Sequence, residues 1–118
     1  LIYLKKIADK LNMDVLVEVH SKNEMQRVLN LKRFDLIGIN NRNLKTFQTD
    51  INVTLDLMKN FITKYPQQNR LFISESGINN NSDLKLLENN GIKGVLIGEK
   101  FMREENIKES FRSLLSSV

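Results

Sequence analysis

Polar side chains gather where an apolar stretch in the middle of the chain ends. Residues 34–39 are mostly apolar, and Asn40, Asn41, Arg42 and Asn43 follow them directly. A guanidinium group is a rigid fork of donors suited to a carboxylate or phosphate, and an amide both donates and accepts hydrogen bonds. Asn40 and Arg42 share a parity, so both can project to the same side of the expected strand end. The cluster favours a site for a polar, anionic ligand over a turn with a surface Arg.

A carboxylate lies at the end of an earlier apolar stretch. Glu18 follows residues 15–17, and the alternation of side chains along a strand places Leu16, Glu18 and His20 on one side. In a barrel that side is the interior, and apolar walls there would raise the pKa of Glu18, so that it could transfer protons near neutral pH. The alternative is a solvated strand-end glutamate, which is the commoner outcome for such a residue taken alone.

Short turns that contain glycine close the last two apolar stretches, at Ser76-Gly77 and at Gly98-Glu99. Glycine lets the backbone approach a phosphate closely, and we expect both glycines to need a positive φ. In a (βα)8 barrel, the loops after strands seven and eight commonly bind phosphate through backbone N–H groups and the start of a short helix. Two such turns on adjacent parallel strands therefore predict a phosphate site.

The apolar stretches alternate with segments of helical periodicity. We expect strands at residues 14–20, 34–39, 70–74 and 94–97, and helices at 2–12, 21–30, 50–65, 79–91, 99–102 and 105–115. Strands that are apolar throughout and alternate with helices form parallel sheets covered by helices. The chain is therefore predicted to be α/β, with four (βα) units that amount to half of an eightfold barrel.

The expected helices carry recognisable ends and apolar stripes. The predicted end signals are an N-cap at Ser21 with Glu24 completing a capping box, a cap at Asp50 or Asn52, and stops at Pro66 and Gly91. The apolar stripes expected to face inward are Met25, Val28 and Leu29, followed by Val53, Leu57, Met58, Phe61 and Ile62. A later helix carries Leu84, Leu86 and Leu87.

Composition limits the class of protein. The chain has 118 residues, 41% of them hydrophobic and 27% charged, which suits one compact domain or a piece of a larger one. It has no Cys and one His, so disulfides, thiolate catalysis and Cys- or His-rich metal sites are excluded within it. The net charge of +4 is scattered, which argues against nucleic-acid binding, and the apolar runs are too short to span a membrane. Because the chain opens Leu1-Ile2-Tyr3 without Met, we expect it to be part of a longer protein.

Four motifs together resemble one enzyme family. They are LVEVH at 16–20, GINNRNLKTF at 38–47, SESGI at 74–78, and VLIGE at 95–99 followed by Met102-Arg103. In this order and spacing, from about residue 13 onward, the chain resembles the indole-3-glycerol phosphate synthases of tryptophan biosynthesis, and its details are most like the forms of cyanobacteria and plastids. The resemblance implies a (βα)8 barrel of which residues 1–118 are a single segment, the C-terminal half with strands five to eight, and the N-terminal half is absent.

The resemblance also implies a reaction and the residues that perform it. The family converts 1-(2-carboxyphenylamino)-1-deoxyribulose 5-phosphate to indole-3-glycerol phosphate by ring closure, decarboxylation and dehydration, with no cofactor and no metal. Three residues match catalytic positions, namely Glu18, which handles protons in the dehydration stage, Asn40 and Glu75. The residues that match substrate contacts are Arg42, Leu44 near the anthranilate ring, Leu96, and the phosphate cradle of Ser76, Gly77, Gly98 and Glu99. Many members have Ser in place of Glu99. A carboxylate side chain cannot hold a phosphate, so only the backbone N–H of Glu99 could contribute.

By the same resemblance, the family's strand-one glutamate and lysine and its strand-three lysine fall before Leu1, so we expect the segment to be inactive alone. The expected partner is a small phosphorylated substrate, with no nucleic acid and no membrane. The full-length protein would be monomeric or fused to another tryptophan-pathway enzyme, in the bacterial cytoplasm or, in a plant or alga, the plastid.

Two alternatives stay open. One is a non-catalytic half-barrel that binds phosphate and self-associates through its open sheet edges, and the other is a related barrel such as phosphoribosylanthranilate isomerase, against which the GINNRNL run argues.

Overall fold

Helices and strands alternate along the chain in the predicted order. The computed structural model describes residues 1–64 and 69–116, with only the backbone of Glu99 and Lys100. The strands are β1 (Leu16–Val19), β2 (Leu36–Asn40), β3 (Leu71–Glu75) and β4 (Gly94–Leu96). The helices are α1 (Ile2–Lys10), α2 (Lys22–Leu31), α3 (Asn52–Lys64), α4 (Asn81–Asn89), α5 (Glu99–Met102) and α6 (Ile107–Leu115). The short helix predicted at 99–102 is confirmed with the expected bounds.

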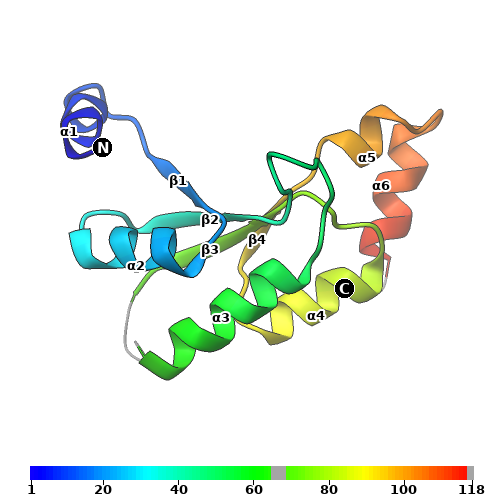
Figure 1. Cartoon of the computed structure of the whole chain (residues 1–118). Helices are drawn as coiled ribbons and strands as arrows, with labels where there is room; N and C mark the ends of the chain where they lie inside the picture. The colour runs from blue at the N-terminus through cyan, green and yellow to red at the C-terminus, as the bar shows by residue number, and fades with distance from the viewer. Residues whose placement is uncertain (65–68, 117–118) are drawn as a thin grey trace.

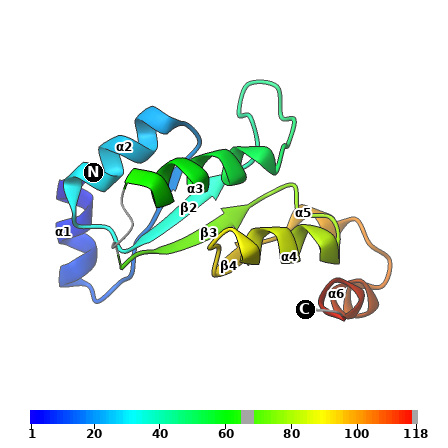
Figure 2. The same cartoon turned by 90° about the horizontal axis from the view of Figure 1, so that it is seen from below.

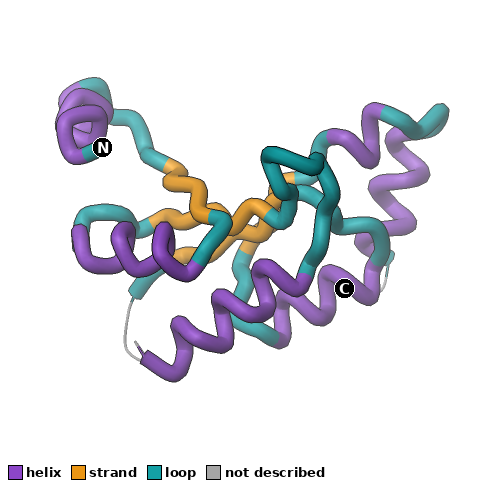
Figure 3. The backbone as a smooth tube through the Cα atoms, viewed as in Figure 1, coloured by secondary structure: helices purple, strands orange, loops and turns teal. Residues whose placement is uncertain are grey.

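The strands form one parallel sheet in chain order, β1-β2-β3-β4, so the predicted α/β half-barrel is confirmed (Figures 1 and 3). The register joins partners on neighbouring strands into rungs. One rung contains Glu18, Gly38, Ile73 and Gly94, and the second rung after it contains Asn40, Glu75 and Leu96. Because side chains alternate between the two faces of a sheet, both rungs point to the same face, near the carboxyl ends of the strands.

One face of the sheet is covered by helices and the other is open. Helices α2, α3 and α4 lie on the same side of the sheet (Figures 1 and 2). The side chains buried between these layers are Val17, Val19, Ile37, Ile39 and Phe72 from the strands and Met25, Val28, Leu29, Leu57, Met58, Phe61, Leu84 and Leu87 from the helices. Each such side chain stabilises the fold by roughly 1.5–3 kcal/mol relative to exposure. On the opposite face Leu16, Leu71 and Leu96 are 37%, 56% and 56% exposed.

Helix α1 stands apart from the sheet and buries none of its residues (Figure 1). Its apolar side chains are uncovered, with Leu4 and the C-cap residue Leu11 both more than half exposed. Together with the open face of the sheet, this helix presents an apolar surface of the kind that another part of a protein normally covers.

Two helix starts use the capping residues that the sequence predicts. The hydroxyl of Ser21 accepts a hydrogen bond from the Glu24 N–H at 3.2 Å. The Glu24 carboxylate accepts from the N–H of His20 at 2.6 Å, so the reciprocal bond of the expected capping box falls one residue early. At α3 the carboxylate of Asp50 accepts from the Asn52 N–H at 2.9 Å, which makes Asp50 the capping side chain there.

The inward face of α3 differs in part from the prediction. Its buried residues are Thr54, Leu57, Met58 and Phe61, whereas Ile62 is 51% exposed. A spacing of three, one and three residues places the buried set on one helix face, and Ile62 falls at the margin of that face. The expected burial of Ile62 was therefore wrong, and the polar Thr54 takes a central place. The predicted stop at Pro66 lies outside the described residues, whereas Gly91 follows α4 with a φ of +87° as expected for a helix stop.

Candidate functional site

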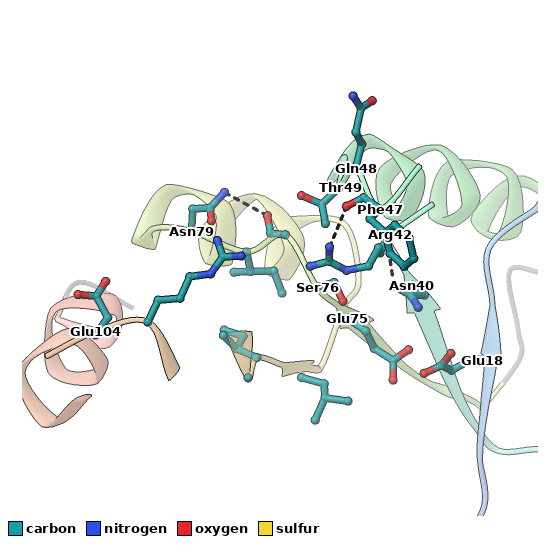
Figure 4. A pocket seen from close by; sticks show the side chains of 16 residues that line it. Glu18, Asn40, Arg42, Phe47, Gln48, Thr49, Glu75, Ser76, Asn79 and Glu104 are labelled. Carbon is teal, nitrogen blue, oxygen red and sulfur yellow. Dashed lines mark hydrogen bonds between the residues drawn. The ribbon is translucent and has the colours of Figure 1, made fainter. Parts of the chain in front are cut away.

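A cavity of about 850 Å³ opens at the carboxyl ends of the four strands (Figure 4). This is the edge at which parallel α/β folds place their active sites. The predicted site residues that line it are Glu18, Asn40, Arg42, Glu75, Ser76, Gly77, Leu96 and Gly98. Leu44 does not line it and is 68% exposed on the loop that follows β2, whereas Phe47 of the same loop does line it. Glu99 begins α5, and its side chain lies outside the described part of the structure.

Two carboxyl groups meet at the base of this cavity. Glu18 and Glu75 point toward one another from β1 and β3 (Figure 4). Glu75 is only 2% exposed, and neither of its carboxylate oxygens has a hydrogen-bond partner among the described residues. Burial, and after it the nearby charge of Glu18, raises the pKa of Glu75 to about 7. The burial expected for Glu18 is found at Glu75, whereas Glu18 itself is exposed.

Gly38 leaves room for the Glu75 carboxyl group. It lies on β2 between the two glutamates, in the same rung as Glu18. A Cβ atom built on Gly38 would lie 2.8 Å from Cδ and from one carboxylate oxygen of Glu75, closer than real Cβ contacts come. The sequence held a signal for this feature, since a glycine inside an apolar strand often marks a close approach.

The raised pKa of Glu75 predicts how the stability of this chain depends on pH. Since the folded-state pKa is about 7 and the ordinary value is 4.5, the folded state holds more protons between these limits. Stability from this group is full below about pH 4.5 and is lost as the pH rises through 7, by at most about 3 kcal/mol. We expect Glu75→Gln to be the more stable protein at pH 8 in urea unfolding. The exposed Glu88→Gln substitution serves as the control, and a stability difference between Glu75→Gln and wild type that does not change with pH would contradict the assignment.

The loop after β2 brings Asn40 and Arg42 to the cavity, as predicted. The side-chain oxygen of Asn40 accepts a hydrogen bond from the Arg42 N–H at 2.9 Å. The Arg42 guanidinium donates to the carbonyl of Phe47 at 2.8 Å, and Arg42 pairs with Thr49 in an isolated antiparallel bridge. These contacts fold the loop back on itself and hold the guanidinium over the cavity (Figure 4).

The other two asparagines of the polar cluster, Asn41 and Asn43, use their side chains within the protein. The side-chain oxygen of Asn43 accepts from the N–H groups of Lys45 and Thr46 at 2.8 and 3.2 Å. Asn41 is 1% exposed and bonds to buried groups of β3 and α3. The sequence shows four adjacent polar residues, but only Asn40 and Arg42 of these line the cavity.

The turn at Ser76-Gly77 has an unusual backbone. Both residues have a φ of +69°, which is uncommon for a residue with a side chain such as Ser76. A Cβ atom on Gly77 would lie 2.7 Å from the Cβ of Thr49. The positive φ expected at both glycines is therefore found at Gly77, but it was wrong for Gly98, where a Cβ atom would also meet nothing within 4 Å.

The described residues contain no cluster of three or more His, Cys, Asp or Glu side chains placed to hold a metal ion. Within the same part of the chain, no helix is both long enough and apolar enough to cross a membrane.

Comparisons with known proteins agree on one family. The family model described as indole-3-glycerol phosphate synthase matches residues 1–114. The chain is 58% identical to the indole-3-glycerol phosphate synthase of Prochlorococcus marinus subsp. pastoris (strain CCMP1986 / NIES-2087 / MED4) and 60% identical to that of Prochlorococcus marinus (strain MIT 9215). Each match covers 100% of this chain and 40% of the relative, so the chain spans less than half the length of these curated relatives.

Proposed function

This chain belongs to the indole-3-glycerol phosphate synthase family, and from that premise we propose that it supplies strands five to eight of a barrel that makes indole-3-glycerol phosphate. In the proposed reaction, 1-(2-carboxyphenylamino)-1-deoxyribulose 5-phosphate closes a ring and loses one CO₂ and one water. The observation that carries the proposal is that one cavity gathers paired carboxyl groups, a guanidinium group and two glycine turns at the strand ends. We call the whole protein of which this segment would be part the full-length synthase.

Glu18 and Glu75 are proposed to move protons. With a pKa of about 7, Glu75 is partly protonated at neutral pH, so its carboxyl group can donate a proton or a hydrogen bond. Glu18 is exposed to the cavity and can accept a proton during the dehydration stage. The nearby charge of Glu18 favours the protonated form of Glu75, so the pair provides one proton donor and one proton acceptor.

Asn40 and Arg42 are proposed to orient the substrate. Arg42 can meet a carboxylate or phosphate with a planar pair of donors, and Asn40 can bond to a sugar hydroxyl. The resemblance to the family assigns apolar contact with the anthranilate ring to Leu44. Phe47 and Leu96 are assigned the same role because they line the cavity. The phosphate is assigned to the backbone at Ser76-Gly77 and at Gly98-Glu99.

The ligand class and location follow from the same proposal. The partner is a small phosphorylated molecule, because the cavity is lined by the guanidinium group of Arg42 and by the glycine turns at Ser76-Gly77 and Gly98, which suit an anionic group. The relatives named above are bacterial enzymes, which supports a place in the cytoplasm of a bacterial cell.

Steady-state turnover of the carboxyphenylamino substrate by the full-length synthase tests this proposal. We expect wild-type turnover, and a kcat/KM that falls roughly 10²-fold in Arg42→Ala, since small errors of orientation are costly. Arg42→Lys should recover only part of the loss, because Lys lacks the planar fork. Arg33→Ala, at an exposed residue outside the cavity, is the control. A wild-type protein without turnover would refute the function, and an Arg42→Lys variant with wild-type kinetics would refute the bidentate role.

A further inference from the structure

Asn41 uses its whole side chain inside the protein. Its Nδ2 donates to the hydroxyl of Ser74 and to the carbonyl of Ser76, both at 2.9 Å. Its Oδ1 accepts from the N–H of Thr54 at 3.2 Å and from the Thr54 hydroxyl at 2.7 Å. An amide side chain offers two donors and an acceptor oxygen with two lone pairs, so every position is filled. The residue is 1% exposed, so none of these bonds is shared with bulk water.

The backbone of Asn41 makes two further links. Its N–H donates to the carbonyl of Glu75 at 2.9 Å, and its carbonyl accepts from the N–H of Asp50 at 3.0 Å. Asn41 therefore joins the end of β3, the start of α3 and the far end of the loop after β2. Its two neighbours in sequence, Asn40 and Arg42, both line the cavity.

One of these partners lies in the turn with the unusual backbone. Ser76 carries a φ of +69°, a strained conformation for a residue with a side chain, which persists only where the surroundings hold it. The N–H of Ser76 donates to the carbonyl of Leu96 at 3.3 Å, and its carbonyl accepts from Asn41. The turn is thus held from β4 on one side and by a side chain of the Arg42 loop on the other.

We propose that Asn41 is a positioning residue that fixes the spacing between Arg42 and the Ser76-Gly77 turn. A ligand with anionic groups at both ends would need these two places at a set distance. Asn41 does not line the cavity, and it acts through the groups on either side of it. The proposal rests on the proposed function only for the identity of that ligand, the phosphorylated substrate.

The neighbouring Thr54 provides a matched control. Its hydroxyl belongs to the same buried cluster, bonding to Asn41 at 2.7 Å and to Ser74 at 2.8 Å, and it is fully buried. Thr54→Val removes these bonds and keeps the shape of the side chain, but it leaves both donor bonds of Asn41, including the one to Ser76. Asn41→Ala removes the link to Ser76 as well. If Asn41 only stabilised the core, both variants would affect ligand binding alike.

The experiment measures competitive inhibition by inorganic phosphate and the KM of the substrate in the full-length synthase, at a temperature where each variant is folded. We expect Asn41→Ala to raise both constants about tenfold, the size expected for a lost buried hydrogen bond that matters to binding, and Thr54→Val to change them less than about twofold. Equal effects of the two variants, or no effect of Asn41→Ala, would overturn the proposal. Should Asn41→Ala not fold, Asn41→Ser makes the same comparison.

A crystal structure of the Asn41→Ala synthase gives a readout that does not depend on the reaction. We expect the Ser76-Gly77 turn to have moved relative to Arg42, and the Thr54→Val structure to retain the wild-type spacing. An unchanged turn in Asn41→Ala would overturn the positioning role even if the protein has no synthase activity. If the turn is unchanged in Asn41→Ala but the wild-type synthase turns over its substrate, the positioning role fails and the proposed function stands. The failure of one proposal is therefore distinguishable from the failure of the other.

Discussion

Glu18→Gln in the full-length synthase is expected to lower kcat by roughly 10²-fold or more while KM stays nearly the same. Gln keeps the size and the hydrogen-bonding reach of the side chain but cannot take up a proton. Glu18 lines the cavity and faces Glu75 across the position of Gly38, so its loss removes one half of a carboxyl pair. Initial-rate kinetics over a range of substrate concentrations separate the two constants.

The matched control for this variant is Glu88→Gln, at an exposed position of α4 away from the cavity. It should leave both kinetic constants unchanged. A Glu18→Gln enzyme with a raised KM and an unaltered kcat would mean that Glu18 binds the substrate without transferring a proton.

Substitutions at the two turn glycines are expected to separate folding from phosphate binding. Gly77 has a φ of +69°, and its Cβ would overlap that of Thr49 at 2.7 Å. Gly77→Val should therefore destabilise the protein by about 1–3 kcal/mol from backbone strain alone, with a further cost from the overlap, and should abolish phosphate inhibition.

Gly98→Val is the variant that isolates binding. A Cβ atom at Gly98 meets nothing within 4 Å, so the fold should be nearly unchanged. The added side chain would stand at the edge of the cavity, and we expect the KM of the phosphorylated substrate to rise about tenfold, which corresponds to about 1.4 kcal/mol of binding. Thermal melts and phosphate inhibition measured on both variants check the pair. A Gly98→Val enzyme with wild-type phosphate inhibition would remove this turn from the phosphate site.

The sequence predicts the order of elements because apolar strands and helical stripes repeat within short windows. The short helix at 99–102, the N-cap at Ser21 and the buried stripe of α2 all depend on residues within one or two turns of one another. The line of polar groups at the strand ends can also be predicted, because the carboxyl ends of parallel strands lie at one edge of the sheet. These features need no knowledge of contacts between distant segments.

The parts that could not be predicted depend on such distant contacts. Asn41 and Ser74 lie 33 residues apart, and a hydrophobic pattern gives no sign that they bond in the core together with Thr54. Glu18 and Glu75 look alike in sequence, each at a strand end, but only Glu75 is buried. The difference is that the carboxyl group of Glu75 lies against Gly38, which has no side chain. This contact depends on the pairing of β2 with β3, which the sequence does not show.

The most direct test of the central claim is a crystal structure of the full-length synthase soaked in inorganic phosphate. The claim is that the cavity at the carboxyl ends of β1 to β4 is the substrate site. We predict one phosphate ion in this cavity, on the backbone N–H groups of the turns at Ser76-Gly77 and Gly98-Glu99, with Arg42 and the two glutamates left clear for the rest of the substrate. A structure in which these turns are empty while phosphate is bound elsewhere in the barrel would contradict the account.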